Sequence, residues 1–491
     1  MSQEFKNYIG GKWVGSGSGE KIDNINPANK SEVTSIFQKG TKDDAAAAVK
    51  AAGEAYPAWK KIPPAKRARY VAKVLELAKN ESDELARIMT LEEGKILAEA
   101  KGEIAKGNTL LEWFAGEGLR LMGISAYSEL PDNMLYTVRK PLGVVSLITP
   151  WNFPWAIPCW KLAPALIAGN TVVFKPASST PWLATKMVEF FEKAGLPEGV
   201  LNLVVGPGSS VGEELLNNEA VKAISFTGSN EIGQHVNEIA AKRLAKVTLE
   251  MGGKNACIIL GDADLELALG GVIKGAFGNA GQRCTATSRL ILIDSIADKF
   301  MDMLVPKVKE IKVGPGLDPT SNMGPVADET QYKSVLDYIE IGKKEADLIT
   351  GGEAVKREDS DGFFVAPTIF DNVTKEMRIH QEEIFGPVLS VIRVKSYEEA
   401  IEVANNTRYG LSSAIFTSNI NTAMKFVEDI EAGMTHINSP TIGGEAQVPF
   451  GGIKATGVGE REMAKEGINF FTEQLTVFID YTGGIRQSNI Y

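Results

Sequence analysis

Short apolar runs alternate with longer amphipathic segments between Val144 and Leu260. The runs are rich in β-branched residues and read VVSLITP, TVVFKP, LNLVVG, AISFTG, KVTLEMGG and NACIIL. The segments that separate the earlier runs, such as Ser210–Asn217 and Glu231–Lys242, are long enough for helices. Continuous apolar strands that alternate with helices are typical of a parallel sheet covered on both faces. The pattern therefore predicts an α/β fold with a Rossmann-like parallel sheet.

A second alternating series follows Leu265. Its runs read RLILID, ADLITGG, APTIFD, PVLSVIRV, SSAIFTS and MTHINS. This series predicts a second α/β unit. No low-complexity linker divides the two series, so we expect the units to meet at a tight hinge near Gly252–Gly253.

The N-terminal part of the chain precedes both series. Its first forty residues are rich in Gly, Asn and Lys and predict a short strand or two with loops. Thr41 is a candidate N-cap for an Ala-rich helix. Apolar residues recur at helical spacing in residues 63–95 and again from Ala98 to Leu121. We expect these helices to cover a sheet.

Two segments fit neither unit, namely Ser125–Val138 and Phe470–Asp480. The second is rich in strand-forming residues and has no later strand with which to pair. An unpaired strand edge invites association. We interpret it as a strand that joins subunits; the alternative is a tail strand that pairs within its own subunit.

Length and charge narrow the function classes. The chain has 491 residues, enough for roughly three structural units. Its net charge of −10 disfavours nucleic acid and anionic membranes as partners. The longest apolar stretches are short and broken by Pro or Gly, so we expect no membrane span. The N-terminus lacks an apolar signal core, which makes the cytoplasm the expected location.

Cysteine and histidine usage argues against a metal site. The three cysteines are Cys159, Cys257 and Cys284, and their spacing matches no metal-binding pair. The three histidines are scattered, with none near a cysteine in sequence. Free thiols fit a reducing compartment, and we predict that no metal is bound.

Polar and Gly-rich residues follow the strands of the first series. They are Pro150, Trp151, Asn152, Lys175, Gly206–Gly212, Thr227, Gly228, Ser229 and Glu250. Ligands of open α/β sheets bind beyond the carboxyl ends of the strands, so these residues predict a binding crevice. The loops GPGSSVG and TGSNEIG each lead into a helix, which suits a pyrophosphate. Neither has the GxGxxG spacing, so each alone is weak support for a nucleotide.

Cys284 is the candidate nucleophile. It lies in GNAGQRCTA, among polar and cationic residues that favour a thiolate. The other two cysteines lie inside apolar runs, as inert core residues do. Glu250, at a strand end, is the best-placed group to activate water; a solvated carboxylate beside a turn is the alternative interpretation.

As a set, these residues resemble the aldehyde dehydrogenase superfamily. The matching stretches are TPWNFPWAIPCWKLAPALIAGNTVVFKPAS (149–178), FTGSNEIG (226–233), LEMGGKN (249–255), GNAGQRCTA (278–286), QEEIFGPV (381–388) and PFGGIKATGVG (449–459). They follow the family's order and cover essentially the whole chain. The family fold implies a dinucleotide-binding domain of residues 1–124 and 143–251, to which residues 445–469 return. It also implies a catalytic domain of residues 252–444 and an oligomerisation element of residues 125–142 and 470–491, in a homodimer or homotetramer.

The resemblance also implies the mechanism. The Cys284 thiolate attacks an aldehyde to give a thiohemiacetal, whose oxyanion is held by the Asn152 amide and the Cys284 backbone N–H. Hydride transfer leaves a thioester that Glu250 hydrolyses through water. Lys161 matches a lysine with a supporting role near the oxyanion. The implied cofactor-binding residues are Ile148, Thr149, Pro150, Trp151, Lys175, Ser178, Gly208, Gly212, Phe226, Thr227, Gly228, Ser229, Ile232, Met251, Gly252, Glu383 and Phe385.

Cofactor preference depends on Lys175 and Ser178. NAD-preferring relatives commonly carry an acidic residue at the position of Ser178, which would repel a 2′-phosphate. With Ser there and a cation nearby, we expect NADP to be preferred and NAD to remain usable. The alternative is that the serine leaves the preference unchanged.

The expected substrate is a semialdehyde. The tract GQRCTATSRLILID and the late INSPTIGGEAQVPFGGIK look most like 2-oxoglutarate semialdehyde (2,5-dioxopentanoate) dehydrogenases. Arg283 is a candidate partner for a distal carboxylate, and Phe153 and Trp160 are candidate walls of the substrate tunnel. Some succinate-semialdehyde relatives carry an Arg at the position of Trp160, which weakens that assignment. Glyceraldehyde, succinate semialdehyde or an aliphatic aldehyde as substrate, and a non-catalytic protein on this fold, remain alternatives.

Overall fold

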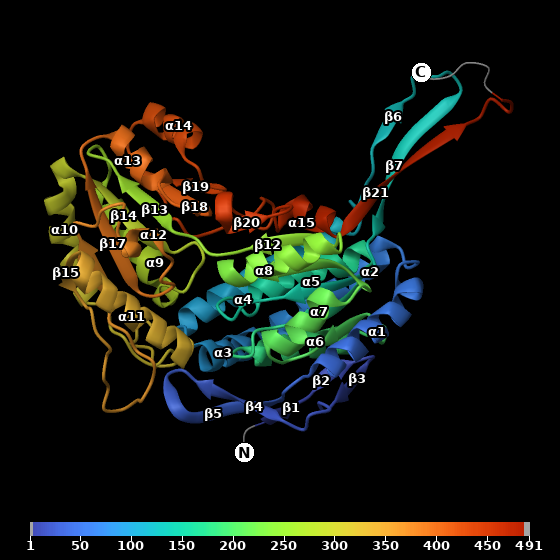
Figure 1. The fold of residues 1–491 in the computed structure, drawn as a ribbon, viewed down its shortest axis with the longest axis horizontal. Coiled ribbons are helices and arrows are strands. Elements are labelled where there is room, and N and C mark those ends of the chain that lie inside the picture. Colours follow the sequence, from blue (N-terminus) through green and yellow to red (C-terminus); the bar gives the residue numbers. More distant parts are fainter. Residues whose placement is uncertain (1–2, 486–491) are drawn as a thin grey trace.

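The computed structural model describes residues 3–485 of the chain. The described chain contains an eight-stranded sheet, a seven-stranded sheet and two three-stranded sheets. Two helix-covered units lie side by side in Figure 1, and a narrow ribbon projects from one of them. The ribbon consists of β6 (Ser125–Tyr127), β7 (Asn133–Pro141) and β21 (Thr472–Asp480).

The eight-stranded sheet contains the first alternating series. Its order is β20-β12-β11-β8-β9-β10-β2-β3, and the strands from β12 to β10 run parallel. The bounds are β2 (Asn7–Ile9), β3 (Lys12–Val14), β8 (Val144–Ile148), β9 (Thr171–Lys175), β10 (Leu201–Leu203), β11 (Val221–Thr227), β12 (Lys246–Glu250) and β20 (Gly457–Val458). Strands such as β9 are buried along their whole length because helices cover both faces. The Rossmann-like α/β prediction is confirmed.

Helices of the N-terminal part and of the first series cover this sheet. They are α1 (Lys42–Trp59), α2 (Pro64–Asn80), α3 (Ser82–Glu93), α4 (Leu97–Glu117), α5 (Ala156–Ala168), α6 (Pro181–Lys193), α7 (Glu213–Asn217), α8 (Asn230–Lys242) and, from the C-terminal part, α15 (Ala464–Phe470). Thr41 caps α1 in a reciprocal capping box with Asp44, as predicted. Every residue of α5 is buried, and this helix packs against α4. Helix α5 is therefore a rigid wall on which the residues before and within it are positioned.

The N-terminal forty residues hold more strands than predicted. They form β1 (Gln3–Phe5), β4 (Lys21–Asn26) and β5 (Asn29–Gln38), which make a separate three-stranded sheet, besides β2 and β3. These strands are short or half exposed, so their apolar signal is weak. The predicted helical segment 63–95 is likewise two helices, α2 and α3, which meet at Glu81.

The seven-stranded sheet has the order β15-β16-β17-β14-β13-β18-β19. Its strands are β13 (Asn255–Ile259), β14 (Thr287–Ile293), β15 (Asp347–Thr350), β16 (Thr368–Asp371), β17 (Val388–Val394), β18 (Ser412–Phe416) and β19 (Met434–Ile437). All run parallel except the edge strand β15. Its helices are α9 (Leu265–Phe277), α10 (Asp294–Lys309), α11 (Glu329–Glu345), α12 (Arg378–Gln381), α13 (Tyr397–Asn405) and α14 (Ile420–Asp429).

The run NACIIL belongs to this second sheet, as β13, and not to the first series in which the sequence placed it. The chain crosses from β12 to β13 through Met251–Lys254 alone, and so short a crossing leaves no mark in the hydrophobic pattern. The crossing still coincides with the expected boundary at Gly252–Gly253. The division of the chain into domains remains a prediction.

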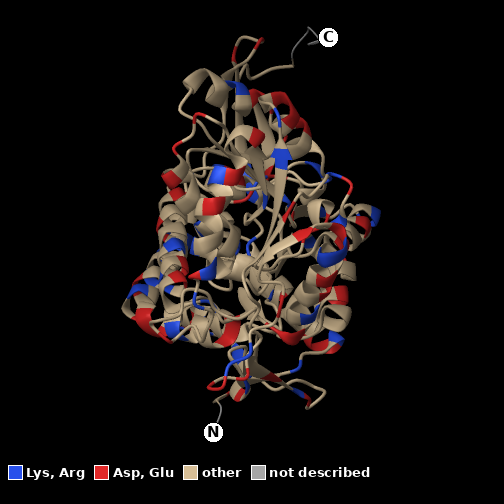
Figure 2. Ribbon diagram, turned by 90° about the vertical axis from the view of Figure 1, so that its left-hand side faces the viewer, with Lys and Arg blue, Asp and Glu red and all other residues tan. Residues whose placement is uncertain are grey.

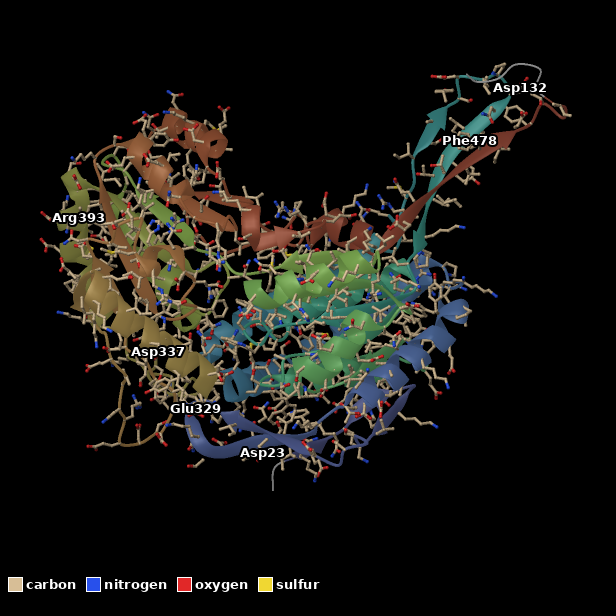
Figure 3. The ribbon with its side chains drawn as sticks, viewed as in Figure 1. Asp23, Asp132, Glu329, Asp337, Arg393 and Phe478 are labelled. Carbon is tan, nitrogen blue, oxygen red and sulfur yellow. The ribbon has the colours of Figure 1, made fainter. Side chains whose placement is uncertain are left out.

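The sequence suggested that strand β21 has no partner strand in its own chain, but the structure shows that it has one. It pairs antiparallel with β7 in the same chain, from Thr472 opposite Pro141 to Asp480 opposite Asn133. Pairing within the subunit, the alternative interpretation, is therefore what the structure has. Strand β21 is nevertheless an edge strand, and its Phe478 lies exposed on the projecting ribbon (Figure 3). Residues 486–491 of the predicted oligomerisation element lie outside the described residues.

Acidic and basic residues are interspersed over the molecule in Figure 2. None of the helices in residues 3–485 is both long and apolar enough to cross a membrane. In the same residues, no three His, Cys, Asp or Glu side chains gather as they would around a metal ion.

Candidate active site

The loop that carries Cys284 is built from strained backbone. Helix α9 ends at Phe277, and a short 3-10 turn, Gly278–Gly281, leads to Cys284 just before β14. Asn279 and Ala280 adopt left-handed backbone with φ of 52° and 51°, which costs side-chain-bearing residues energy and is found mainly at functional sites. Gly281 has φ of 70°, and a Cβ there would overlap the Gly386 carbonyl oxygen. Only glycine fits this position, so the approach to Cys284 is fixed by its neighbours.

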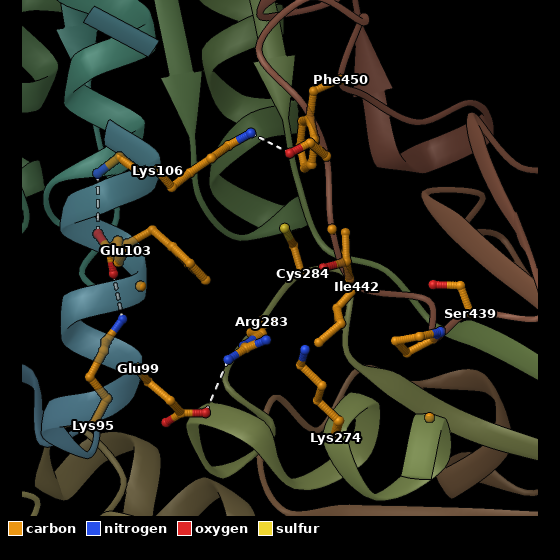
Figure 4. A pocket seen from close by; sticks show the side chains of 18 of the residues that line it. Lys95, Glu99, Glu103, Lys106, Lys274, Arg283, Cys284, Ser439, Ile442 and Phe450 are labelled. Atoms are coloured by element: carbon orange, nitrogen blue, oxygen red, sulfur yellow. Dashed lines mark hydrogen bonds and ion pairs between the residues drawn. The ribbon is translucent and has the colours of Figure 1, made fainter. Parts of the chain in front are cut away.

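A cavity of about 940 Å³ opens beside Cys284. Helix α4 forms one wall and α9 another, and the segment around Ile442 closes a third side (Figure 4). The predicted residues Phe153, Trp160, Glu250 and Arg283 line it together with Cys284. The structure thus gathers the candidate nucleophile, carboxylate and substrate residues around one space.

Hydrogen-bond donors surround the thiol. The backbone N–H groups of Cys284 and Thr285 point at it. The buried Asn152 donates from its side-chain amide to the Gln282 carbonyl at 3.0 Å, which places the amide next to the nucleophile's own loop. An amide nitrogen carries two N–H groups, so one remains for an oxygen bound beside Cys284.

The environment of Cys284 does not lower its pKa, contrary to the expectation from its cationic neighbours. Burial first, and then the charges of Glu250 and Glu383, raise the pKa of the thiol to about 12. Arg283, the cation that the sequence placed beside it, instead donates to Glu99 at 3.0 Å. At neutral pH the thiol is therefore protonated, and attack requires a base to remove its proton.

Glu250 ends β12 and is buried, with its Oε2 lacking a hydrogen-bond partner. Burial, reinforced by the nearby Glu462 and opposed by Lys161 and Arg461, raises its pKa well above the ordinary value. A carboxylate with a raised pKa is matched to taking a proton near neutrality. Glu250 lines the cavity shared with Cys284, where its unpartnered oxygen can activate water.

Lys161 belongs to a buried polar group behind Glu250. Its amine donates to Glu462 and, at 2.7 Å, to the Ser225 hydroxyl. Trp160 donates from its indole N–H to the same Glu462 at 2.6 Å. Lys161 thus contacts neither Asn152 nor Cys284 in the contacts described, and it acts on Glu250 by charge. Its supporting role near the oxyanion remains a prediction.

The predicted cofactor-binding residues gather at the carboxyl ends of the parallel strands. Ile148 ends β8, followed by Thr149, Pro150 and Trp151, and Lys175 ends β9, with Ser178 just beyond. Gly208 and Gly212 bound a π-helical turn that leads into α7. Phe226 and Thr227 end β11, Gly228 and Ser229 lead into α8, which Ser229 caps, and Ile232 lies in its first turn.

This crevice fits a dinucleotide. The buried Thr227 hydroxyl has no hydrogen-bond partner among the described residues, so it is free to bond to water or to a polar ligand. A Cβ at Gly208 would meet nothing within 4 Å, and one at Gly212 would meet only the Lys175 stem. The π-helical turn and the start of α8 therefore leave room for a pyrophosphate near backbone N–H groups.

Residues of the second sheet close the crevice on its other side. Glu383 accepts from the Gly253 N–H at 3.0 Å, and a Cβ at Gly252 would overlap its carboxylate. Burial raises the pKa of Glu383 to about 7. The ring of Phe385, a residue with φ of 55°, meets that of Trp151 edge-on at 5.4 Å. Because Gly252, next to Met251, has no side chain, the Glu383 carboxylate can approach the end of β12, where the cofactor residues converge.

A family model described as "Aldehyde dehydrogenase family" matches residues 13–477. The chain belongs to the aldehyde dehydrogenase family. Its fold is the aldehyde dehydrogenase fold, and the protein is an NAD(P)-dependent oxidoreductase of aldehydes.

Two named relatives of this aldehyde dehydrogenase act on a five-carbon semialdehyde. One is an alpha-ketoglutaric semialdehyde dehydrogenase of Bacillus subtilis, 46% identical over 477 residues, which cover 97% of this chain and 98% of the relative. Another is a 2,5-dioxopentanoate dehydrogenase of Saccharolobus solfataricus, 44% identical over 96% of this chain and 99% of the relative. A succinate-semialdehyde dehydrogenase [NADP(+)] of Escherichia coli is 40% identical over 95% of both chains.

Solved structures agree with this fold. A betaine aldehyde dehydrogenase of Staphylococcus aureus in complex with NAD+ superposes with a TM-score of 0.95, at 36% identity, over 99% of this chain and 96% of that chain. A structure described as an Escherichia coli NADP dependent enzyme gives a TM-score of 0.94 at 39% identity, over 97% of this chain and 98% of that chain.

Sequence reasoning missed several polar residues of the aldehyde dehydrogenase site. Glu99 and Glu103 lie one turn apart on α4 and hold Arg283 and Lys95, and Glu103 also accepts from two backbone N–H groups at the start of α5. The four-residue spacing of Glu99 and Glu103 puts both side chains on one helix face, and this spacing could have been recognised in the sequence. Glu462 had no such signal, since it joins the site from a distant turn.

Proposed function

We propose that this aldehyde dehydrogenase oxidises 2-oxoglutarate semialdehyde to 2-oxoglutarate, with Cys284 as nucleophile. The observation that carries the proposal is the convergence of Cys284 and Glu250 on one cavity whose walls also bear cations, with the Asn152 amide bonded to the Gln282 carbonyl in the loop of the nucleophile. A nucleophile, a base of raised pKa and an amide donor are the groups that oxidation through a thioester requires.

Each residue has a defined step. Cys284 loses its proton to Glu250 and its sulfur bonds to the aldehyde carbon. The Asn152 side-chain N–H and the Cys284 backbone N–H then hold the resulting oxyanion; losing one such donor typically costs about 2.7–4 kcal/mol of barrier. A bound nicotinamide supplies the acceptor for the hydride that leaves the carbon. Glu250 then passes the thiol proton to solvent and, again a carboxylate, takes a proton from water, whose oxygen bonds to the thioester carbon. The C–S bond breaks, the sulfur takes that proton from Glu250, and the acid departs.

The substrate proposal rests on chemistry at the cavity and on the named relatives. The cavity wall carries Lys95, Lys106, Lys274 and Arg283, which suit an aldehyde with a distal carboxylate. Phe153 and Trp160 supply apolar walls for its carbon chain. Relatives named for malonate and succinate semialdehydes are also similar, at 42% and 40% identity, so these shorter acids are the competing substrates.

We further propose that NADP is preferred over NAD. Lys175 is buried, donates only to the Pro176 carbonyl among the contacts described in residues 3–485, and has no carboxylate beside it. Ser178 donates to the Gly206 carbonyl, so no acid stands where a 2′-phosphate would bind. The cation and the missing acid together favour the phosphorylated cofactor.

Assembly into a homodimer or homotetramer is part of the proposal. Strands β21 and β19 are both edges of their sheets, and β21 exposes Leu475 and Phe478. Exposed apolar strand edges favour pairing with another copy. Sedimentation should give two or four copies, and Phe478→Glu should lower that number; a wild-type monomer would contradict the assembly. The free thiols of all three cysteines suit the cytoplasm.

Nicotinamide reduction by the purified protein tests the function. The substrates are 2-oxoglutarate semialdehyde, succinate semialdehyde, glyceraldehyde and an aliphatic aldehyde, each with NADP and with NAD, beside Cys284→Ala. We expect the highest kcat/KM for 2-oxoglutarate semialdehyde with NADP and no turnover in the variant. Equal rates on all aldehydes would refute the substrate, and activity in Cys284→Ala would refute the nucleophile.

A further inference from the structure

The four cations of the cavity wall differ in what they already bind. Lys95 is paired with Glu103 at 2.6 Å and also donates to the Asn152 carbonyl. Arg283 is paired with Glu99. Lys106 donates to the Gly444 carbonyl. The Lys95 amine and the Arg283 guanidinium are therefore paired with carboxylates, and the Lys106 amine with a carbonyl, before any substrate arrives.

Lys274 differs from the other three. Within residues 3–485 it takes part in no hydrogen bond or ion pair of its side chain that the structure records. It lies near the end of α9, and its amine points into the cavity on the same side of Cys284 as Arg283 (Figure 4). An uncompensated ammonium in a partly enclosed cavity attracts an anion more strongly than a paired one does.

The surface of α9 leaves this amine accessible to a ligand. Helical side chains lean toward the N-terminus, over the residue four positions earlier, which for Lys274 is Gly270. A Cβ at Gly270 would meet nothing within 4 Å, and Gly270 and Gly271 both line the cavity. The open space at Gly270 forms a notch along which a short carbon chain can reach the lysine, whereas the ring of Phe416 fills the space beside Gly271.

The acidic residue on the same wall does not neutralise it. Glu266 also lines the cavity on α9, but eight residues from Lys274 it lies about 12 Å along the helix axis. At that separation, exposed charges interact weakly in salt. Glu99 is already held by Arg283, so neither carboxylate pairs with Lys274 in the described residues.

We infer that Lys274 binds the distal carboxylate of the semialdehyde and is the main determinant of selectivity for carboxylate-bearing over neutral aldehydes. This rests on the proposed function and refines it, because the sequence had assigned that contact to Arg283. The ammonium donates to the carboxylate while the aldehyde carbon lies at Cys284. Arg283, compensated by Glu99, then contributes shape and hydrogen bonding more than net charge.

The test compares kcat/KM for 2-oxoglutarate semialdehyde with that for butanal, in wild type, Lys274→Met, Lys274→Arg and Arg283→Met. Lys307→Met, on the outer helix α10 away from the cavity, is the matched control. We expect Lys274→Met to lower the ratio about tenfold, the loss of one charge-assisted hydrogen bond. Lys274→Arg should restore most of it, and Lys307→Met should leave it unchanged.

A second measurement avoids turnover. Calorimetric titration of each protein with 2-oxoglutarate, the product, should give a Kd about tenfold weaker for Lys274→Met, with the wild-type Kd rising with salt. An unchanged ratio and Kd in Lys274→Met would overturn the inference, and a drop in Arg283→Met alone would return the contact to Arg283. A wild type that oxidises butanal as well as the semialdehyde would instead refute the proposed substrate.

Discussion

The two large sheets present opposite ends of their strands to the site. In the eight-stranded sheet the site residues follow the strands: Thr149 after β8, Lys175 at the end of β9 and Glu250 at the end of β12. In the seven-stranded sheet they precede the strands: Cys284 lies before β14, and Glu383 lies before β17. The site is therefore a meeting of carboxyl ends with amino ends, joined by the short crossing from β12 to β13.

The two sides also differ in how their backbone is held. On the seven-stranded side, Asn279, Ala280 and Phe385 all have positive φ. The strand-end residues named on the eight-stranded side adopt ordinary extended or helical backbone and rely on glycines for close approach. Strain fixes the nucleophile's position, whereas open glycine turns leave room for a ligand. The seven-stranded side thus positions the nucleophile, and the eight-stranded side binds the ligand.

The largest effect is expected where the two sides meet, at Glu250. Glu250→Gln removes the base that hydrolyses the thioester, so kcat should fall by roughly 10²–10⁴-fold. Because Glu250 also takes the thiol proton, the rapid first turnover should slow as well, by a smaller factor. Stopped-flow measurement of nicotinamide reduction separates the two phases. Glu266→Gln, another carboxylate of the cavity wall, is the control and should stay within about twofold; an active Glu250→Gln would show that another group activates water.

The strain on the catalytic side is tested by Gly281→Ala. The added Cβ meets the Gly386 carbonyl oxygen and requires positive φ, so we expect the free energy of unfolding to fall by about 2–3 kcal/mol. Displacement of the loop should also lower kcat. Gly53→Ala in α1, where a Cβ meets nothing, should instead raise stability by about 0.5–1 kcal/mol. Denaturant unfolding measures both, and equal effects would show that the loop is pliable.

The raised pKa of Cys284 predicts how its reactivity depends on pH. The thiolate fraction rises about tenfold per pH unit below the pKa, which lies at about 12. Alkylation by iodoacetamide of the cofactor-free protein should therefore accelerate steadily from pH 7 to 10. Mass spectrometry identifies the labelled cysteine, and the buried Cys159 and Cys257 should stay unmodified. A plateau below pH 9 would mean that the site stabilises the thiolate after all.

The smallest effect concerns the binding side. Burial lowers the pKa of Lys175 to about 8, so the amine is charged below that pH and neutral above it. A 2′-phosphate interacts with the charged form, and we therefore expect the ratio of kcat/KM for NADP over NAD to fall severalfold as pH rises from 7 to 9. Lys175→Met should have a low ratio at every pH. A ratio in wild type that is independent of pH would remove Lys175 from phosphate recognition.

The contrast between site residues that follow their strands and site residues that precede them explains which of these residues the sequence could predict. Residues that follow apolar runs, such as Lys175 and Glu250, were found because the rule on carboxyl ends of parallel strands applies to them. Cys284 and Glu383 lie before their strands, where no such rule applies. The polar neighbours of Cys284 made it the candidate nucleophile, and only the family motifs identified Glu383. The raised pKa of Cys284 was mispredicted because neighbours in sequence do not reveal that Arg283 turns to Glu99. Pairings such as Trp160 with Glu462 join residues about 300 positions apart and leave no local pattern.

The pairing of β7 with β21 has a consequence for how the protein is made. Thr472 pairs with Pro141, so the ribosome must add more than three hundred residues after β7 before its partner exists. At about 5–20 residues per second this takes roughly 20–60 s. Throughout that time β7 presents an unpaired edge, and such edges promote aggregation of nascent chains. Slower synthesis should lower the soluble yield of the wild type, and chaperones that bind extended apolar segments should restore it.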